Sequence, residues 1–299
     1  MDGILLIDKP PGFTSFDVIA KLRQMTKTKK IGHAGTLDPL ATGVLPVFFG
    51  RAAKAVDLLP SHDKAYIAGV KLGTATDTQD ITGKVLYEKP HSVTAREIEC
   101  ALSSFTGRIL QTPPMYSAVR VNGKRLYSLA RNGQEIEREP RNVTIYELRL
   151  LESDESSGVY SILIKCSSGT YVRTLCHDLG EKLGCGAVMT SLRRTMACGY
   201  EIEDCITLET AQEHTGSGTL ALLPVSSVFS DLPELVLNEI QTRHFLNGLQ
   251  LGLSQFSIVP GGERIRAVDG HGRFLGLAKA DRLENKLVIV KLFALGVPQ

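Results

Sequence analysis

The sequence lacks any apolar run long enough to cross a membrane, since a transmembrane helix needs about 20 consecutive apolar residues. Its first eight residues are acidic rather than basic and do not resemble a signal peptide. Gly12 and Gly32 are not spaced as a phosphate-binding loop followed by Lys and Ser or Thr. No internal repeat or low-complexity segment is evident. We therefore expect a cytoplasmic protein without a membrane partner and without a nucleotide-binding glycine signature.

Closely spaced cysteine pairs are also missing. None of the six cysteines forms a CxxC pair, and most lie within apolar patterns. Zinc sites and disulfide frameworks normally show such pairs at regular spacing. We therefore expect buried thiols in a reducing compartment, with no disulfide and no bound metal.

The length of 299 residues suggests about two domains. With 43% hydrophobic and 22% charged residues, the composition is typical of a globular protein. The pattern changes near residue 230, where short alternating segments replace longer elements. We expect a larger domain over 1–229 and a small β-rich unit over 230–299. The elements expected in the small unit are a helix over 238–248, strands over 255–259, 264–268, 273–280 and 287–294, and a hairpin turn over 269–272.

The rest of the chain is organised around one stretch, Gly32–Pro46, with the sequence GHAGTLDPLATGVLP. Three glycines and two prolines in fifteen residues predict an irregular loop, neither strand nor helix. Pro39 biases Asp38 towards an extended or turn conformation. A carboxylate held between apolar neighbours is a candidate active-site group. The alternative is a surface Asp-Pro turn, which is common for these residues.

Regular periodicity elsewhere predicts a mixture of strands and helices. Thr14 with Asp17, and Thr94 with Glu97, have the spacing of capping boxes that begin helices. A strongly periodic helix begins at Val172. The predicted strands cover 2–7, 64–73, 142–152 and 159–166, the last of them central and buried.

Arg173 occupies an unusual position in this last helix. It lies in the first turn, where the helix dipole favours acidic side chains. An anionic partner would explain an arginine there. Asp38 is one such partner, and an ordinary surface ion pair is the alternative.

Basic residues gather in three clusters although the net charge is only +2. Positive clusters interleaved with tyrosines suit a phosphate-rich partner, whereas isolated clusters are commonly solvated faces. Residues 111–133 are expected to form a long functional loop with some helix near 127–131. The clusters are Lys21, Arg23, Lys27, Lys29 and Lys30; then Arg120, Lys124, Arg125 and Arg131 with Tyr116 and Tyr127; and finally Arg193 and Arg194.

Five stretches in order resemble the TruB family, the bacterial tRNA pseudouridine(55) synthases. The resemblance implies an α+β pseudouridine synthase fold, a mixed and mainly antiparallel sheet with flanking helices over 1–229. It also implies a small C-terminal barrel-like PUA domain over 230–299 that binds RNA. The stretches are Leu6–Gly12, Gly32–Pro46, Lys64–Tyr66, Ser168–Arg173 and Ser191–Arg194.

The same resemblance implies isomerisation of uridine 55 in the T-loop of tRNA to pseudouridine, by base flipping and an essential aspartate. It implies no cofactor, no metal, no guide RNA and no obligatory protein partner, and a monomer that contacts the T-loop and acceptor end of tRNA. Two alternatives stay open. One is a guide-RNA-dependent, dyskerin-type synthase, and the other is a tRNA-folding helper without catalysis.

The resemblance also assigns residue roles. It makes Asp38 the essential carboxylate, Arg173 its partner, and Tyr66 a stacking platform and a candidate for proton transfer. It implies that residues 111–133 fold over the RNA. Contacts to substrate or packing around the loop are implied for His33, Tyr171, Leu192, Lys9, Lys64, Asp80 and Arg194.

Overall fold

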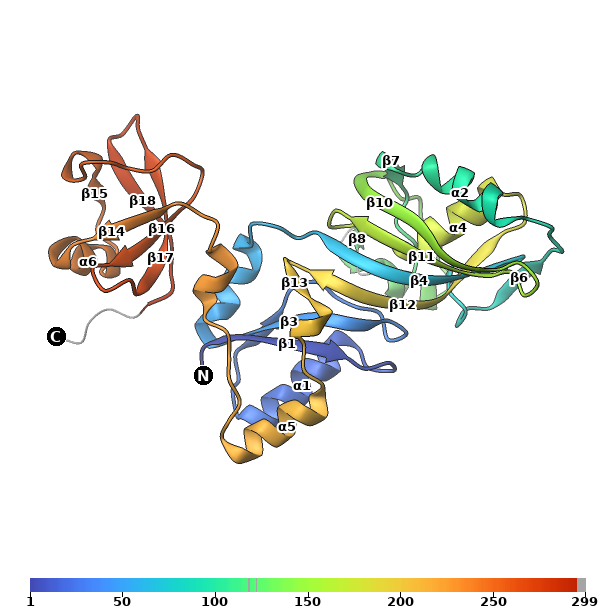
Figure 1. Ribbon diagram of the computed structural model, residues 1–299, viewed down its shortest axis with the longest axis horizontal. Helices are drawn as coiled ribbons and strands as arrows, with labels where there is room; N and C mark the ends of the chain where they lie inside the picture. The colour runs from blue at the N-terminus through green and yellow to red at the C-terminus, as the bar shows by residue number, and fades with distance from the viewer. Residues whose placement is uncertain (118, 122, 295–299) are drawn as a thin grey trace.

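The protein is elongated and carries two large β-sheets placed one after the other along its long axis (Figure 1). The structure is a computed structural model that describes residues 1–294 except 118 and 122. Within this described part, no helix has the length and apolar character needed to span a membrane.

The larger sheet is mixed and mainly antiparallel, as predicted. Among the described strands of this sheet, only β3 and β12 pair in parallel, and β11 lies between β4 and β10 as the expected central strand. Short β2 (Ile31–His33) and β13 (Tyr200–Glu201) pair with β3 and β12. The main order is β1 (Gly3–Lys9), β3 (Thr42–Phe49), β12 (Ala187–Ala197), β4 (Lys64–Leu72), β11 (Val159–Cys166), β10 (Arg141–Asp154) and β7 (Gly107–Gln111).

Two pairs of helices cover this sheet. Helices α1 (Ser15–Thr26) and α5 (Leu208–Ser217) pack on β1 and β3, and the predicted capping box of Thr14 begins α1. Helices α2 (Ala95–Ser103) and α4 (Val172–Lys182) share a core with β4, β11 and β12. The two groups lie at different ends of the sheet (Figure 1), so the strands between them connect two separate apolar cores.

The central stretch Gly32–Pro46 is only partly a loop, so the prediction of an irregular segment was wrong at both ends. Its first residues belong to β2 and its last residues to β3. Val44 to Phe49 are fully buried, and this apolar run outweighs the glycine and proline signals. Pro46 has no N–H to donate, and its carbonyl accepts from the N–H of Ala34 at 3.0 Å. The irregular part is limited to residues 34–41.

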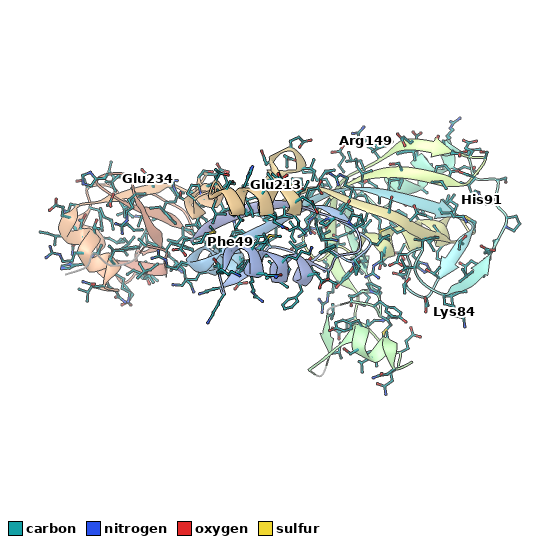
Figure 2. The ribbon with its side chains drawn as sticks, turned by 90° about the horizontal axis from the view of Figure 1, so that it is seen from below. Phe49, Lys84, His91, Arg149, Glu213 and Glu234 are labelled. Atoms are coloured by element: carbon teal, nitrogen blue, oxygen red, sulfur yellow. The ribbon has the colours of Figure 1, made fainter. Side chains whose placement is uncertain are left out.

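Several short elements surround the sheet. The segment that contains α3 (Leu126–Arg131) is green in Figure 2 and projects away from the rest of the molecule. The helix predicted near 127–131 is therefore confirmed, while the side chains of Arg120, Lys124, Arg125 and Arg131 lie outside the described part. The other short elements are β5 (Thr74–Thr76), β6 (Val85–Glu88), β8 (Arg120–Val121), β9 (Lys124–Arg125), η1 (Gly50–Leu58), η2 (Ile202–Asp204) and η3 (Val225–Phe229).

The second sheet contains five strands and is covered by α6 (Glu239–Leu246), with Asn238 as the predicted N-cap. The turn after Asp269 and the strands on both sides of it are confirmed. The strand predicted over 255–259 is wrong. Phe256 and Val259 pack against the apolar core without a strand partner. The observed elements are β14 (Glu234–Leu237), β15 (Leu251–Gly252), η4 (Leu253–Gln255), β16 (Ile265–Asp269), β17 (Phe274–Asp281) and β18 (Lys286–Leu292).

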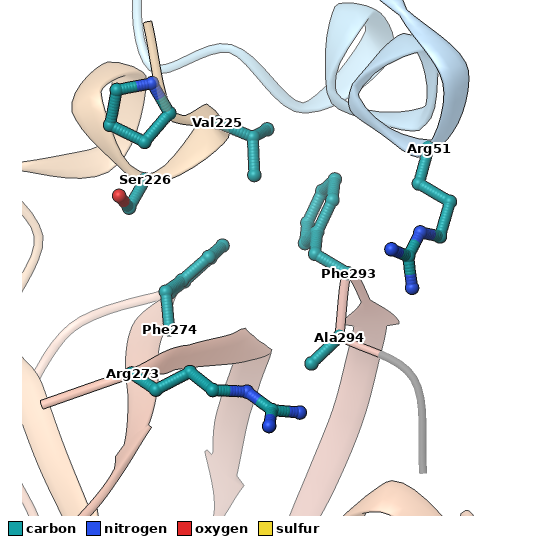
Figure 3. Close-up of a pocket in the computed structure, with 8 residues that line it drawn as sticks. Arg51, Val225, Ser226, Arg273, Phe274, Phe293 and Ala294 are labelled. Atoms are coloured by element: carbon teal, nitrogen blue, oxygen red, sulfur yellow. The ribbon is translucent and has the colours of Figure 1, made fainter. Parts of the chain in front are cut away.

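An aromatic cluster joins the two sheets. Phe229 from η3 is fully buried, and its ring centroid lies 5.9 Å from that of Phe274 and 5.8 Å from that of Phe293. Ile4 of the larger sheet belongs to the same core. An open pocket of about 390 Å³ lies beside the cluster, between Arg51 and Arg273 (Figure 3). The second sheet is therefore fixed to the first by apolar packing.

This packing predicts that Phe229→Ala strongly destabilises the protein. Removing a fully buried phenylalanine side chain typically costs about 3–5 kcal/mol of the free energy of unfolding. Phe16→Ala is the matched control, because Phe16 is 64% exposed. Denaturant unfolding of both variants provides the measurement. Equal stability of the two variants would contradict a packed junction.

Candidate active site

The candidate carboxylate and its expected partner lie together. The Nε of Arg173 is 3.2 Å from the Oδ2 of Asp38. Asp38 comes from the loop between β2 and β3, and Arg173 from the first turn of α4. The Arg173 side chain is only 7% exposed, whereas that of Asp38 is 42% exposed. The ion pair therefore presents its carboxylate side to solvent and keeps its guanidinium inside the protein.

Arg173 has three further partners, which explain how a guanidinium can be buried at a helix N-terminus. Its Nη1 lies 3.5 Å from the Oδ2 of Asp80 and 3.3 Å from the carbonyl oxygen of Thr78. Its Nη2 donates to the carbonyl oxygen of Tyr116 at 2.9 Å. Burying an arginine is costly unless its charge and its N–H groups find partners. Here two carboxylates and two carbonyls supply them.

Asp80 is itself held firmly. It lies between β5 and β6, is 6% exposed, and accepts from the hydroxyl of Thr78 at 2.9 Å and from the N–H of Thr82 at 3.0 Å. Because Asp80 is fixed in this way, it holds one edge of Arg173 while Asp38 occupies another. The two predicted residues are thus joined through Arg173.

An apolar wall adjoins the ion pair. Leu37, Tyr66 and Leu192 are all buried in one core cluster, on the loop, β4 and β12 respectively. Burial raises the pKa of Tyr66 to about 12, although the positive charge of Arg194 opposes the increase. Tyr66 is therefore a neutral phenol at pH 7 and can donate a hydrogen bond.

Arg194 lies beneath the loop. It is fully buried and donates to the carbonyl oxygens of Val44 at 2.7 Å and Gly35 at 3.1 Å, with Thr36 at 3.5 Å. Gly43 is required beside it, because a Cβ at Gly43 would lie 2.1 Å from the Arg194 carbonyl oxygen. Arg194 therefore braces both ends of the loop that carries Asp38.

Two more predicted residues, Lys9 and Lys64, lie near Arg194. Lys9 is fully buried at the end of β1, and its Nζ donates to the carbonyl oxygens of Pro10 and Phe13. Burial lowers the pKa of Lys9 to about 8, and nearby Asp38 counteracts part of that decrease. Lys64 donates to the His62 carbonyl at 2.6 Å. Burial lowers its pKa, and Arg194 lowers it further.

His33 ends β2 and is half-buried. Burial lowers its pKa, and repulsion from Arg194 acts in the same direction. The neutral imidazole is therefore favoured at neutral pH. Its Nδ1 is buried without a hydrogen-bond partner in the described structure.

Tyr171 is the N-cap residue of α4, two positions before Arg173. Both main-chain polar groups of Tyr171 pair with the amide of Gln111, at 2.7 and 3.0 Å. Sequence reasoning did not identify Gln111, Tyr116 or Thr78 as parts of the site. Thr78 and Tyr116 bind Arg173 through their main-chain carbonyl oxygens. Every residue has a carbonyl, so the residue type does not predict such a contact. Gln111 and Tyr116 do lie in the predicted functional segment 111–133.

The described residues contain no group of three or more His, Cys, Asp or Glu side chains that could hold a metal ion. The arrangement offers a partly exposed carboxylate paired with a buried arginine, beside a neutral phenol and an apolar wall. Such a set can bind a planar polar group and supply a negative charge or a nucleophile to it.

Comparison with known proteins identifies the family of this chain. Residues 23–172 match the model described as "TruB family pseudouridylate synthase (N terminal domain)", and residues 173–225 match "tRNA pseudouridylate synthase B C-terminal domain". Similar curated proteins named tRNA pseudouridine synthase B include one from Syntrophomonas wolfei, 40% identical over 97% of each chain. Another, from Stutzerimonas stutzeri, is 43% identical over 93% of this chain and 92% of its own.

Solved structures show the same fold. A structure titled "Crystal Structure of a Cbf5-Nop10-Gar1 Complex" matches with a TM-score of 0.74 and 25% identity, over 98% of this chain and 85% of the other. A second, titled "Structure of H/ACA RNP bound to a substrate RNA containing 2'-deoxyuridine", has a TM-score of 0.72 and 23% identity, over 99% and 85% of the two chains. With its sequence relatives and its family-model matches, the chain belongs to the TruB family of pseudouridylate synthases.

Proposed function

We propose that this protein isomerises uridine to pseudouridine in tRNA, that its target is uridine 55 of the T-loop, and that it acts without guide RNA. The observation that carries the proposal is the 3.2 Å ion pair between Asp38 and Arg173, set against an apolar wall in a TruB-family chain. The curated relatives are named for tRNA, which favours this substrate. Modification of tRNA makes the cytoplasm the proposed compartment.

The proposed reaction rearranges bonds without any external reactant. The bond between C1′ of the ribose and N1 of uracil breaks, the base rotates, and C1′ bonds to C5. The proton on C5 is released, and N1 gains one. No net oxidation occurs, so side chains alone are sufficient in principle. The reaction is proposed to need neither metal nor cofactor.

Asp38 is the proposed catalytic residue. Its carboxylate can attack C1′ of the sugar or C6 of the uracil, or remove a proton from C2′. All three routes require the Asp38 carboxylate to lie next to the target nucleotide. Arg173 orients the carboxylate and balances its charge. Tyr66, with a pKa of about 12, is proposed to stack on the base and to donate a hydrogen bond.

The target base must leave the folded T-loop to reach Asp38. Flipping a base costs a few kcal/mol, and stacking on an aromatic ring contributes about 1–3 kcal/mol per base. The proposed contacts around the flipped nucleotide come from His33, Tyr171 and Leu192. Arg173 also links the site to the segment 111–133 through the Tyr116 carbonyl. This segment is proposed to close over the RNA.

We further propose that residues 1–229 form the catalytic domain and that 230–299 form a PUA-like domain that contacts the acceptor end of tRNA. The second unit has eight Lys or Arg and seven Asp or Glu residues. Its net charge of 8 − 7 = +1 is too small for non-specific attraction to dominate. We propose that it binds the acceptor end through complementary shape, and that the packing around Phe229 fixes its orientation relative to the catalytic domain. The protein is proposed to act as a monomer without an obligatory protein partner.

The first test uses purified protein and an unmodified tRNA transcript. We expect pseudouridine at position 55 in the presence of a metal chelator, detected by chemical mapping of the modified base. An isolated T-arm hairpin should react with a higher KM, because it lacks the acceptor end. Binding without any product would favour the tRNA-folding helper, and activity only after addition of guide RNA and partner proteins would favour the dyskerin-type alternative.

The second test is Asp38→Asn, which keeps the shape of the side chain but removes its charge and most of its nucleophilicity. We expect kcat to fall at least about 1,000-fold, within the range for loss of a catalytic proton-transfer group. The affinity for tRNA should remain nearly unchanged. Asp57→Asn on η1 removes an exposed carboxylate and should retain full activity. Substantial turnover by Asp38→Asn would exclude the proposed role of Asp38.

The third test concerns the basic cluster before β2. Lys29 and Lys30 are exposed. If both contact phosphates, the double variant Lys29→Ala/Lys30→Ala should make the salt dependence of tRNA binding less steep, by about 0.7–0.9 in the log–log slope per lost contact. Lys182→Ala, at the exposed end of α4, is the matched control. An unchanged slope in the double variant would show that these lysines are only solvated.

A further inference from the structure

Ser15 has no assigned role, yet its side chain touches the catalytic loop. It is the first residue of α1 and is 1% exposed. Its Oγ accepts from the N–H of Leu37 at 2.8 Å and lies 3.3 Å from the Leu37 carbonyl oxygen, to which it donates. The two residues are separated by 22 positions in the chain. Leu37 immediately precedes Asp38.

The hydroxyl of Ser15 is available for this contact because another residue caps the helix. The Thr14 hydroxyl accepts from the N–H of Asp17, and the Asp17 carboxylate accepts from the N–H of Thr14. This capping box at the start of α1 does not involve Ser15. A serine at the first helical position would otherwise be expected to interact with its own helix or with solvent. Here it is committed to the loop.

A second bond holds the other side of Asp38. The N–H of Gly12, in the turn before α1, donates to the Pro39 carbonyl oxygen at 2.9 Å. The peptide of Leu37 is thus tied to the first residue of α1, and that of Pro39 to the turn before α1. Asp38 itself is bonded through its carbonyl to the N–H of Ala41 at 3.0 Å. The backbone at Asp38 is fixed from three directions.

We propose that Ser15 is a positioning residue, which fixes the Leu37 peptide and thereby places the Asp38 carboxylate against Arg173 and the target nucleotide. The inference rests on the proposed function of Asp38. Arg173 is fixed independently by Asp80 and two carbonyls, so loss of the Ser15 bonds would move Asp38 alone. A small displacement of a reacting group can reduce a rate about 100-fold.

The experiment compares Ser15→Ala with Thr242→Val. Thr242 is 9% exposed and donates to the Leu237 carbonyl within the second sheet, so it provides a buried hydroxyl away from Asp38. For Ser15→Ala we expect a fall of about 10- to 100-fold in the single-turnover rate, with the Kd for tRNA unchanged within about twofold. Thr242→Val should retain the wild-type rate. The melting temperatures of both variants are measured alongside.

A rate for Ser15→Ala equal to that of the wild type, or a fall in rate matched by Thr242→Val, would overturn the proposal. If Ser15→Ala does not fold, Ser15→Cys carries the same test, since it keeps the side-chain size but replaces the hydroxyl with a weakly bonding thiol. The proposed function is checked first with the wild-type protein. If the wild type makes no pseudouridine, that function fails. Crystal structures then decide about Ser15, because an Asp38–Arg173 separation unchanged in Ser15→Ala would overturn its positioning role.

Discussion

The buried guanidinium of Arg173 is the interaction on which the site depends. It joins parts of the chain that are distant in sequence: the loop with Asp38, the hairpin with Asp80, and the segment with Tyr116. Each is held by polar bonds to a residue that the sheet and α4 keep in place. Loss of the cation would leave Asp80 buried without its ionic partner, which is a costly arrangement.

The scaffold beneath this cation is rigid for a simple reason. Strands β4 and β12 are paired over nearly their full length, and Tyr66 lies opposite Arg194 in their register. One strand pair therefore fixes the phenol and the residue that braces the loop. Sites built on paired strands hold side chains more firmly than sites built on loops alone. Asp38 and its neighbours lie outside this strand pair, and Ser15, Gly12 and Arg194 supply the bonds that hold them.

Local signals in the sequence predicted much of the fold. Both capping boxes, the alternation in β4 and β11 and the apolar face of α4 are decided by residues close together in the chain, so they could be identified without a structure. The failures share a cause. The first end of Gly32–Pro46 became a strand because β3 provides a partner, and the last end did so because β1 and β12 provide partners. Residues 255–259 have no strand partner among the described residues. Strand pairing depends on distant partners that local patterns do not encode.

The sequence predicted the ion pair of the site, but not the hydrogen bonds that hold its residues in place. An arginine in the first turn of a helix required an anion, and that argument pointed to Asp38. Carbonyl acceptors such as those of Thr78 and Tyr116 carry no sequence signal, because every residue has one. The same is true of the bond between Ser15 and Leu37, which depends on how α1 packs beside the loop.

The buried basic residues that hold the site in place also determine its electrostatics. Lys9, Arg173 and Arg194 are all buried, and two of them are satisfied mainly by neutral carbonyls rather than by carboxylates. The surplus of positive charge has visible effects, since Arg194 helps to lower the pKa values of His33 and Lys64. Positive charge in a low-dielectric region is compensated most effectively by anions brought close to it. The groups that hold the loop therefore also place positive charge beside the Asp38 carboxylate.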